Sequence, residues 1–158
     1  MKSIVILDDY QNVALTFGAW DKLAGRATIK VLNRHIASQA ELTAELADAN
    51  IIVANRERTV ITDALLATLP KLELIVTSGM RNASIDVAAA NARGITVCGT
   101  STLGYPTAEL TWAMILAFMR RLPKEVASLA AGGWQTSVGV GVRGKTLGII
   151  GLGRIGSD

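Results

Sequence analysis

The sequence is poor in cysteine, in aromatic side chains and in clustered charge. Its single cysteine, Cys98, has no partner for a disulfide within the chain, which favours a reducing compartment. Aromatic residues make up only 4% of the 158 residues, so Ala, Val, Ile and Leu supply most of the apolar material. The net charge of +3 comes from 16 basic and 13 acidic side chains scattered along the chain. Because no run of Lys or Arg forms a basic stripe, we expect no nucleic-acid partner.

Long apolar segments are also missing. The apolar run that precedes Asp8 is shorter than the stretch of about 7–15 residues in a secretory signal. The longest apolar helical segment, residues 110–119, contains Thr111 and is well short of the ~20 residues of a membrane span. We therefore expect a cytoplasmic protein that does not contact a membrane.

Short apolar runs alternate with amphipathic stretches through the first hundred residues. The runs are rich in Ile, Val and Leu without polar alternation, which is typical of parallel strands covered on both faces. They lie at residues 3–7, 28–32, 51–54, 72–77 and 95–98. The helical stretches between them carry start and stop signals at Gly25, Ser38 with Glu41, Thr62, Pro70, Asp86 and Gly94. This alternation predicts an α/β domain with a doubly wound parallel sheet of five strands.

The pattern changes after residue 106. A helix at 110–122 is apolar nearly all round, and a helix of this kind is buried between domains or subunits. Earlier in the chain, the spacing of Val13, Phe17 and Trp20 predicts a first helix, with its apolar residues on one face. Another helix follows Pro123, and residues 146–150 read as a further strand.

A glycine motif follows that last strand directly. Gly151-Leu152-Gly153-Arg154-Ile155-Gly156 has the G-x-G-x-x-G spacing of a dinucleotide-binding turn, in which the glycines permit a tight turn and close approach to a pyrophosphate. The N–H groups at the start of the next helix then face the phosphates. The helix and the acidic residue expected about 20 positions later are not among these residues. From the pattern alone, cofactor binding and an ordinary strand turn are equally open, and NAD is not distinguished from NADP.

Three segments, in this order, resemble the D-isomer-specific 2-hydroxyacid dehydrogenases, the family of phosphoglycerate dehydrogenase and hydroxypyruvate reductase. They are residues 78–86 with 93–95, residues 107–111, and residues 145–156. The resemblance implies a flavodoxin-like substrate-binding domain at 1–101 and a loop with an interdomain helix at 102–122. It implies the truncated start of a NAD-binding Rossmann domain at 123–158. It also implies a homodimer built through the region after Thr107.

The resemblance assigns roles to particular residues. Backbone around Gly79, with Ser78, Met80 and Arg81, is expected to bind the carboxylate of a small 2-hydroxy or 2-keto acid. Met80 also corresponds to a residue on the nicotinamide side of the cofactor, NAD or NADP. The residues expected to hold that cofactor's phosphates are Gly151, Gly153, Arg154, Ile155 and Gly156.

Two arginines are candidates from their position alone. Arg56 and Arg58 follow the third strand, at the edge where ligands bind in open α/β sheets. We expect them to attract an acidic substrate and assign Arg58 to the substrate site; the alternative is that both are solvated loop charges. Many family members have small residues at Met80 and Arg81, so the substrate pocket here is expected to differ in shape and charge.

The family's catalytic arginine, glutamate and histidine all follow the cofactor turn. None of them corresponds to a residue of this chain, and the only histidine, His35, lies far upstream. We expect no metal site and no catalytic residue before Asp158, and a chain that is inactive alone. The functional hypothesis is hydride transfer between NAD(P) and a 2-hydroxy or 2-keto acid. The alternative is a non-catalytic binding or dimerisation module derived from that family.

Asp8-Asp9 raises one rival, because phosphoacceptor receiver domains also carry an acidic pair after their first strand. A receiver further requires an Asp after the third strand and a Lys after the fifth. Those places hold Asn55-Arg56 and Gly99-Thr100, so the receiver hypothesis fails.

Overall fold

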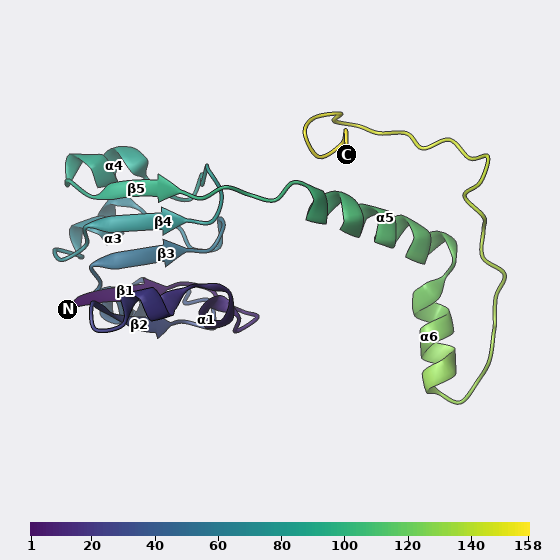
Figure 1. The fold of residues 1–158 in the computed structure, drawn as a ribbon, viewed down its shortest axis with the longest axis horizontal. Coiled ribbons are helices and arrows are strands. Elements are labelled where there is room, and N and C mark those ends of the chain that lie inside the picture. The colour runs from purple at the N-terminus through teal and green to yellow at the C-terminus, as the bar shows by residue number, and fades with distance from the viewer. The chain divides into compact units, whose positions relative to one another are not determined.

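Five parallel strands form the sheet of the N-terminal unit (Figure 1). They are β1 (Lys2–Ile6), β2 (Ala27–Val31), β3 (Ile51–Ala54), β4 (Leu74–Thr77) and β5 (Thr96–Gly99). Their order, β2-β1-β3-β4-β5, is that of flavodoxin-like folds and confirms the predicted fold class. The chain winds outward from β1 to β2 and then returns to β3 on the other side of β1. The winding direction therefore reverses between β1 and β3.

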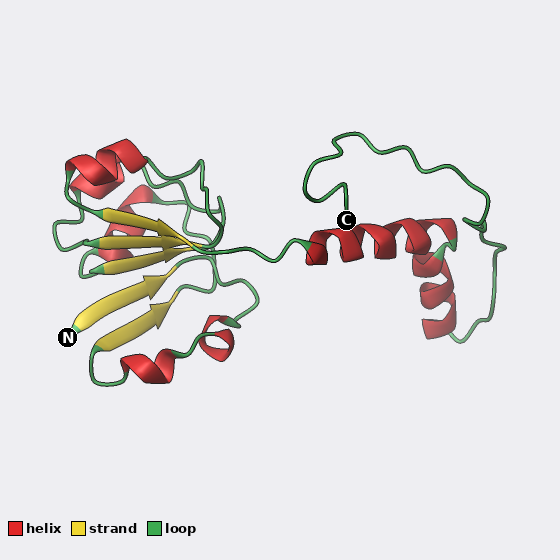
Figure 2. Ribbon diagram, turned by 45° about the horizontal axis from the view of Figure 1, so that its top comes forward, coloured by secondary structure: helices red, strands yellow, loops and turns green.

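The computed structural model describes all 158 residues, without gaps. They divide into two compact units, Met1–Thr102 and Leu103–Asp158. Helices lie on both sides of the sheet in the first unit (Figure 2). These are α1 (Ala14–Phe17), the short 3-10 helix η1 (Trp20–Leu23), α2 (Gln39–Leu46), α3 (Asp63–Ala67) and α4 (Val87–Ala92).

The predicted helix starts are confirmed by their caps. The side chains of Ser38, Thr62 and Asp86 each accept a hydrogen bond from the backbone N–H three residues later. The first predicted helix is divided, however, because Gly18 adopts an extended conformation between α1 and η1. The Trp20 indole folds back to donate to the Ala14 carbonyl (2.7 Å) and fills the space where a Cβ of residue 18 would lie. A continuous helix is incompatible with that indole position.

The two faces of the sheet are covered unequally. On one face Val5, Ile52 and Ile75 pack in the main core with residues of α2, α3 and α4. On the other face Ile4 and Ile6 of β1 are buried, but Val53 and Val76 are only half-buried. The expectation that the strands are covered on both faces is therefore wrong for β3 to β5, because α1 is a single turn and lies near β1 and β3.

The second unit is built on α5 (Tyr105–Met119) and α6 (Leu122–Ala130). Helix α5 begins five residues before the apolar segment predicted at 110–122. Pro106 fits its first turn, because the N–H that proline lacks would have no partner there. Arg121 links the helices with a left-handed backbone (φ 54°). None of the residues of α5 or α6 is buried.

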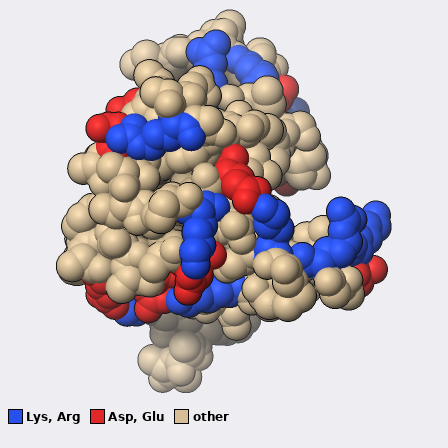
Figure 3. Space-filling view, turned by 90° about the vertical axis from the view of Figure 1, so that its left-hand side faces the viewer, with Lys and Arg blue, Asp and Glu red and all other residues tan.

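The strand expected at residues 146–150 does not form. Its side chains are exposed, that of Ile150 completely, and the second unit offers no neighbouring strand to complete a ladder. A single extended segment without a partner is not a stable strand in water. No helix in the chain combines the length and the apolar character that crossing a membrane demands. Acidic and basic side chains are interspersed on the face shown in Figure 3.

Candidate functional site

Strained backbone gathers at the carboxyl ends of β1, β3 and β4. Asp8, Asn12 and Arg56 have φ values of 55° to 58°, and Gly79 has φ 100°. Non-glycine residues rarely adopt positive φ, and such strain concentrates at functional sites. Ligands of open α/β sheets also bind at this edge, beside the point where the winding reverses. The loops after these three strands are therefore the candidate site.

Gly79 is the centre of the loop after β4. It is buried, its N–H donates to Thr100 Oγ1 (3.0 Å), and a Cβ there would lie 3.2 Å from Nη1 of Arg56. The backbone angle favours glycine here, and a Cβ would also press on the guanidinium group of Arg56. The structure brings Arg56 against the predicted carboxylate-binding backbone.

Gly99, at the end of β5, packs directly against the backbone of this loop. A Cβ at Gly99 would lie 2.7 Å from the Gly79 carbonyl oxygen and 2.8 Å from the Cα of Met80. Since both are backbone atoms, no side-chain rotation relieves the clash. Gly99 was not among the predicted site residues, although a glycine ending a strand is a signal of close backbone approach.

Two polar side chains join the loops after β3 and β4. The Asn82 amide donates to the Arg56 carbonyl (2.7 Å) and to Thr77 Oγ1 (2.9 Å). Ser78 Oγ accepts from the Arg56 N–H (2.9 Å) and donates to Asn55 Oδ1 (3.3 Å). These bonds fix Arg56 relative to Gly79. The sequence made Ser78 and Arg56 candidates for the site but gave no role to Asn82.

Met80 and Arg81 face solvent beside Gly79. Met80 is 72% exposed, and the N–H groups of both residues donate to no acceptor within the chain. Both residues line a cavity of about 460 Å³ with Asn82 and Val97. Free N–H groups beside a guanidinium form a setting that suits a carboxylate, since charge-assisted bonds from both are strong.

Arg58 opens onto a second cavity of about 420 Å³. This cavity is also lined by Gln11, Val13, Asn55 and Ser78. The structure therefore brings Arg58 and Ser78 together, while Met80 and Arg81 line the neighbouring cavity.

The glycine turn of the second unit has the local geometry that its spacing predicts. Gly151 has φ 86°, and its carbonyl accepts from the Gly153 N–H (2.9 Å). A Cβ at Gly156 would lie 2.6 Å from the Gly151 carbonyl oxygen. The turn therefore favours glycine at its first position and requires it at its third, and the residues between them are exposed.

These features define a class of protein: a doubly wound α/β unit with a glycine-centred loop after β4, joined to a segment with a G-x-G-x-x-G turn. The family model for the catalytic domain of D-isomer specific 2-hydroxyacid dehydrogenases matches residues 4–142. The chain belongs to this family.

Known relatives extend well beyond the matched region. Human D-3-phosphoglycerate dehydrogenase is 35% identical over 133 residues, which are 82% of this chain and 25% of that enzyme. The crystal structure of phosphoglycerate oxidoreductase from Vibrio cholerae O395 is 40% identical, with a TM-score of 0.92 over 99% of this chain and 51% of that one. An NADPH-dependent glyoxylate/hydroxypyruvate reductase from Sinorhizobium meliloti, solved with NADP and malonate, is 27% identical, with a TM-score of 0.65 over 99% and 48%. The chain thus spans about half of these solved structures.

Proposed function

We propose that this chain supplies the substrate-binding part of an NAD(P)-dependent D-2-hydroxyacid dehydrogenase. The observation that carries the proposal is the Gly79 loop, where the Arg56 guanidinium lies against Gly79 and the N–H groups of Met80 and Arg81 donate to no acceptor within the chain. Such a loop binds the carboxylate of a 2-hydroxy or 2-keto acid. Ser78 holds the loop in place, and Arg58 adds positive charge in the adjoining cavity.

The domain limits follow the same proposal. Residues 1–101 bind substrate, residues 102–122 form the connection and its helix, and residues 123–158 begin the nucleotide-binding part. A nicotinamide cofactor supplies the hydride acceptor or donor when it is bound. Backbone at Gly151, Gly153, Arg154, Ile155 and Gly156 would hold its phosphates, and Met80 would face the nicotinamide. Both NAD and NADP fit this assignment, and the Sinorhizobium relative is a reductase that was solved with NADP.

These 158 residues bind and orient substrate but do not, in this proposal, carry out turnover alone. The family's arginine, glutamate and histidine have no counterpart among them, and His35 contacts Asp8 rather than the Gly79 loop. We propose that the protein acts in the cytoplasm as a homodimer through the region after Thr107.

A second candidate is a non-catalytic binding or dimerisation module derived from this family. The observation that favours it is α5, whose apolar side chains at Leu110, Trp112, Met114 and Phe118 are all exposed in the single chain. Such a surface requires a partner.

Titration of the ¹⁵N-labelled chain with pyruvate, followed by NMR, tests the first proposal. The amide signals of Gly79, Met80 and Arg81 should shift, and acetate, which lacks the 2-keto group, should shift them less. A matched control is Arg143→Met, which removes an exposed arginine of the second unit and should leave the titration unchanged. Equal responses to the two acids, or none, would reject the substrate-binding role. Reduction of pyruvate by the purified chain with NADH would instead reject the claim that these residues are inactive alone.

A further inference from the structure

A buried carboxylate lies beside the candidate site and has no part in the function proposed above. Asp8, two residues after the end of β1, is 2% exposed and has a left-handed backbone. Its Oδ2 accepts from Thr59 Oγ1 (2.6 Å), and its Oδ1 lies 3.1 Å from Nδ1 of His35 and accepts from the Tyr10 hydroxyl (3.3 Å). Removing a carboxylate from water is unfavourable unless partners replace the water. Here the partners come from the loops after β1, β2 and β3.

The backbone carbonyl of Asp8 binds an arginine of the loop after β3. The carbonyl oxygen accepts from Nη1 of Arg58 (2.6 Å). The side chain thus anchors the residue in a conformation that places its carbonyl at the guanidinium. A carboxylate bond to Thr59, one residue after Arg58, links the same two loops a second time.

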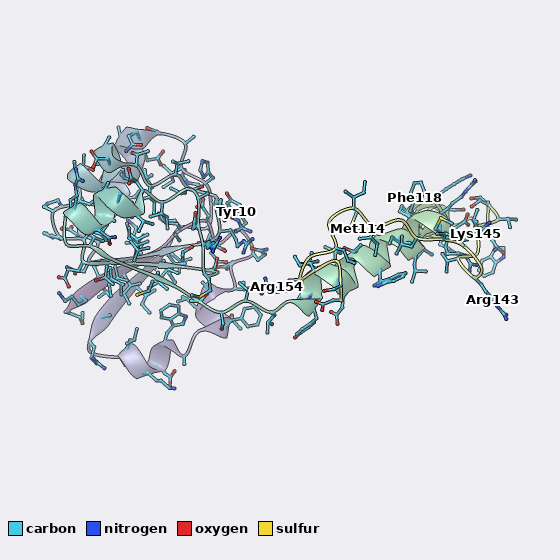
Figure 4. The ribbon with its side chains drawn as sticks, turned by 90° about the horizontal axis from the view of Figure 1, so that it is seen from above. Tyr10, Met114, Phe118, Arg143, Lys145 and Arg154 are labelled. Atoms are coloured by element: carbon cyan, nitrogen blue, oxygen red, sulfur yellow. The ribbon has the colours of Figure 1, made fainter.

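Tyr10 holds the guanidinium from another side. The Arg58 Cζ atom lies 4.5 Å from the centre of the Tyr10 ring, a cation–π distance. The Tyr10 hydroxyl is fixed by Asp8, so one carboxylate controls both contacts of the arginine. Burial and, after it, the charge of Asp8 raise the pKa of Tyr10, so the phenol remains a donor to that carboxylate. Figure 4 labels Tyr10 among the loops of the N-terminal unit.

The held arginine keeps its charge available. Arg58 bonds to a carbonyl and an aromatic ring, whereas Arg34 and Arg93 form ion pairs with carboxylates. Its remaining N–H donors are not needed by Asp8, and the side chain lines the cavity shared with Asn55 and Ser78. Asp9 also lines this cavity, but its carboxylate accepts from the N–H groups of Val13 and Ala14. An arginine fixed in advance loses less freedom when it binds an anion.

We infer that Asp8 and Tyr10 are positioning residues that hold Arg58 ready for the acidic substrate. The inference rests on the proposed function, since it takes Arg58 as a substrate-binding residue. It assigns the Asp8 cluster to binding and not to stability alone. If the inference is right, replacing Asp8 lowers the affinity for an anion only when Arg58 is present.

A double-mutant cycle with oxalate as the probe tests this consequence. Calorimetry on Arg58→Met should show affinity for oxalate lowered about tenfold, as expected for one charge-assisted contact. Asp8→Asn, which preserves size and tolerates the left-handed backbone, should lower it severalfold in the native chain. In the Arg58→Met background, Asp8→Asn should have no further effect. Equal effects of Asp8→Asn in both backgrounds would overturn the inference while leaving the substrate-binding proposal intact.

A ligand-free readout guards against a variant that merely misfolds. The Arg58 side-chain protons should be shifted upfield by the Tyr10 ring in NMR spectra. Tyr10→Phe, which keeps the ring but loses the bond to Asp8, should reduce this shift, and Tyr10→Leu should abolish it and weaken oxalate binding. Normal oxalate affinity in Tyr10→Leu would contradict the positioning role. A native chain that binds no oxalate would reject the substrate-binding proposal together with the positioning role. A native chain that binds oxalate, with Tyr10→Leu binding it equally well, would reject the positioning role alone.

Discussion

At the scale of single residues, Gly79 and Gly25 have the same need for positive φ but different surroundings. Gly25 (φ 72°) has open space where a Cβ would lie, whereas Gly79 (φ 100°) has Arg56 Nη1 at 3.2 Å. Gly25→Ala should therefore lower the free energy of unfolding by about 1 kcal/mol, the strain of a left-handed residue. Gly79→Ala should lower it by about 2–3 kcal/mol and also abolish the pyruvate response. Urea unfolding of the two variants measures the difference, and equal losses would show that the Arg56 contact contributes nothing.

Single residues also show which parts of the site could be predicted. Gly79, Gly151 and Gly156 occur in local motifs, and at each the structure favours glycine through a positive φ or a close backbone contact. Asn82 and Gly99 act through contacts between loops far apart in sequence, and such contacts depend on strand order and register. A sequence read without that register does not show which loops meet. The substrate role of Gly79 and the cofactor roles of Gly151 and Gly156 stay predictions.

At the scale of elements, helix α4 begins at a cap that closes the candidate loop. Asp86 Oδ1 accepts from the Ala89 N–H (2.9 Å), and the helix has only six residues. Asp86→Ala should lower the free energy of unfolding by about 1 kcal/mol because the N–H loses its acceptor. Asp86→Ser retains an acceptor and should be close to native in the same urea titration. A Ser variant as unstable as the Ala variant would refute the capping explanation.

The start of α6 contains a contact that depends on pH. Hydrogen bonds from the Ser137 hydroxyl, and then from the Thr136 N–H (2.8 Å), lower the pKa of Glu125 below its usual 4.5. Since the folded pKa is lowered, the contact is complete above pH 4.5 and is lost as pH falls through the lower value. The Thr136 amide signal should therefore titrate with a midpoint below 4.5. Glu125→Gln should remove this titration, and a midpoint above 4.5 would contradict the assignment.

The elements differ in how far their sequence determines them. The strands of the sheet were found within two residues, because each is a short run of Ile, Val and Leu with a partner available. Residues 146–150 have the same composition but no strand to pair with, so composition alone gave the wrong result. The helix around Val13 to Trp20 was divided by an indole that turns back on its own segment, which periodicity does not reveal.

At the scale of the whole molecule, the exposed apolar surface of α5 predicts self-association. Phe118 is 82% exposed on this helix. Phe118→Glu should weaken self-association at least tenfold, because a charge would be buried in the contact. Val60→Glu, at an exposed apolar position of the N-terminal unit, is the matched control and should leave it unchanged. Analytical ultracentrifugation across a concentration series measures both, and a native chain that remains monomeric would exclude the homodimer proposal.

The bond from the Gly79 N–H to Thr100 has a consequence for synthesis on the ribosome. Strands β1 to β4 are complete in the nascent chain by Thr77, but the loop that follows rests on Gly99 and is bonded to Thr100, at the far end of β5. A translating ribosome thus releases most of the sheet before it releases the residues that shape this loop. The capacity to hold an anion should arise late and abruptly during translation, when β5 docks on the finished part of the sheet.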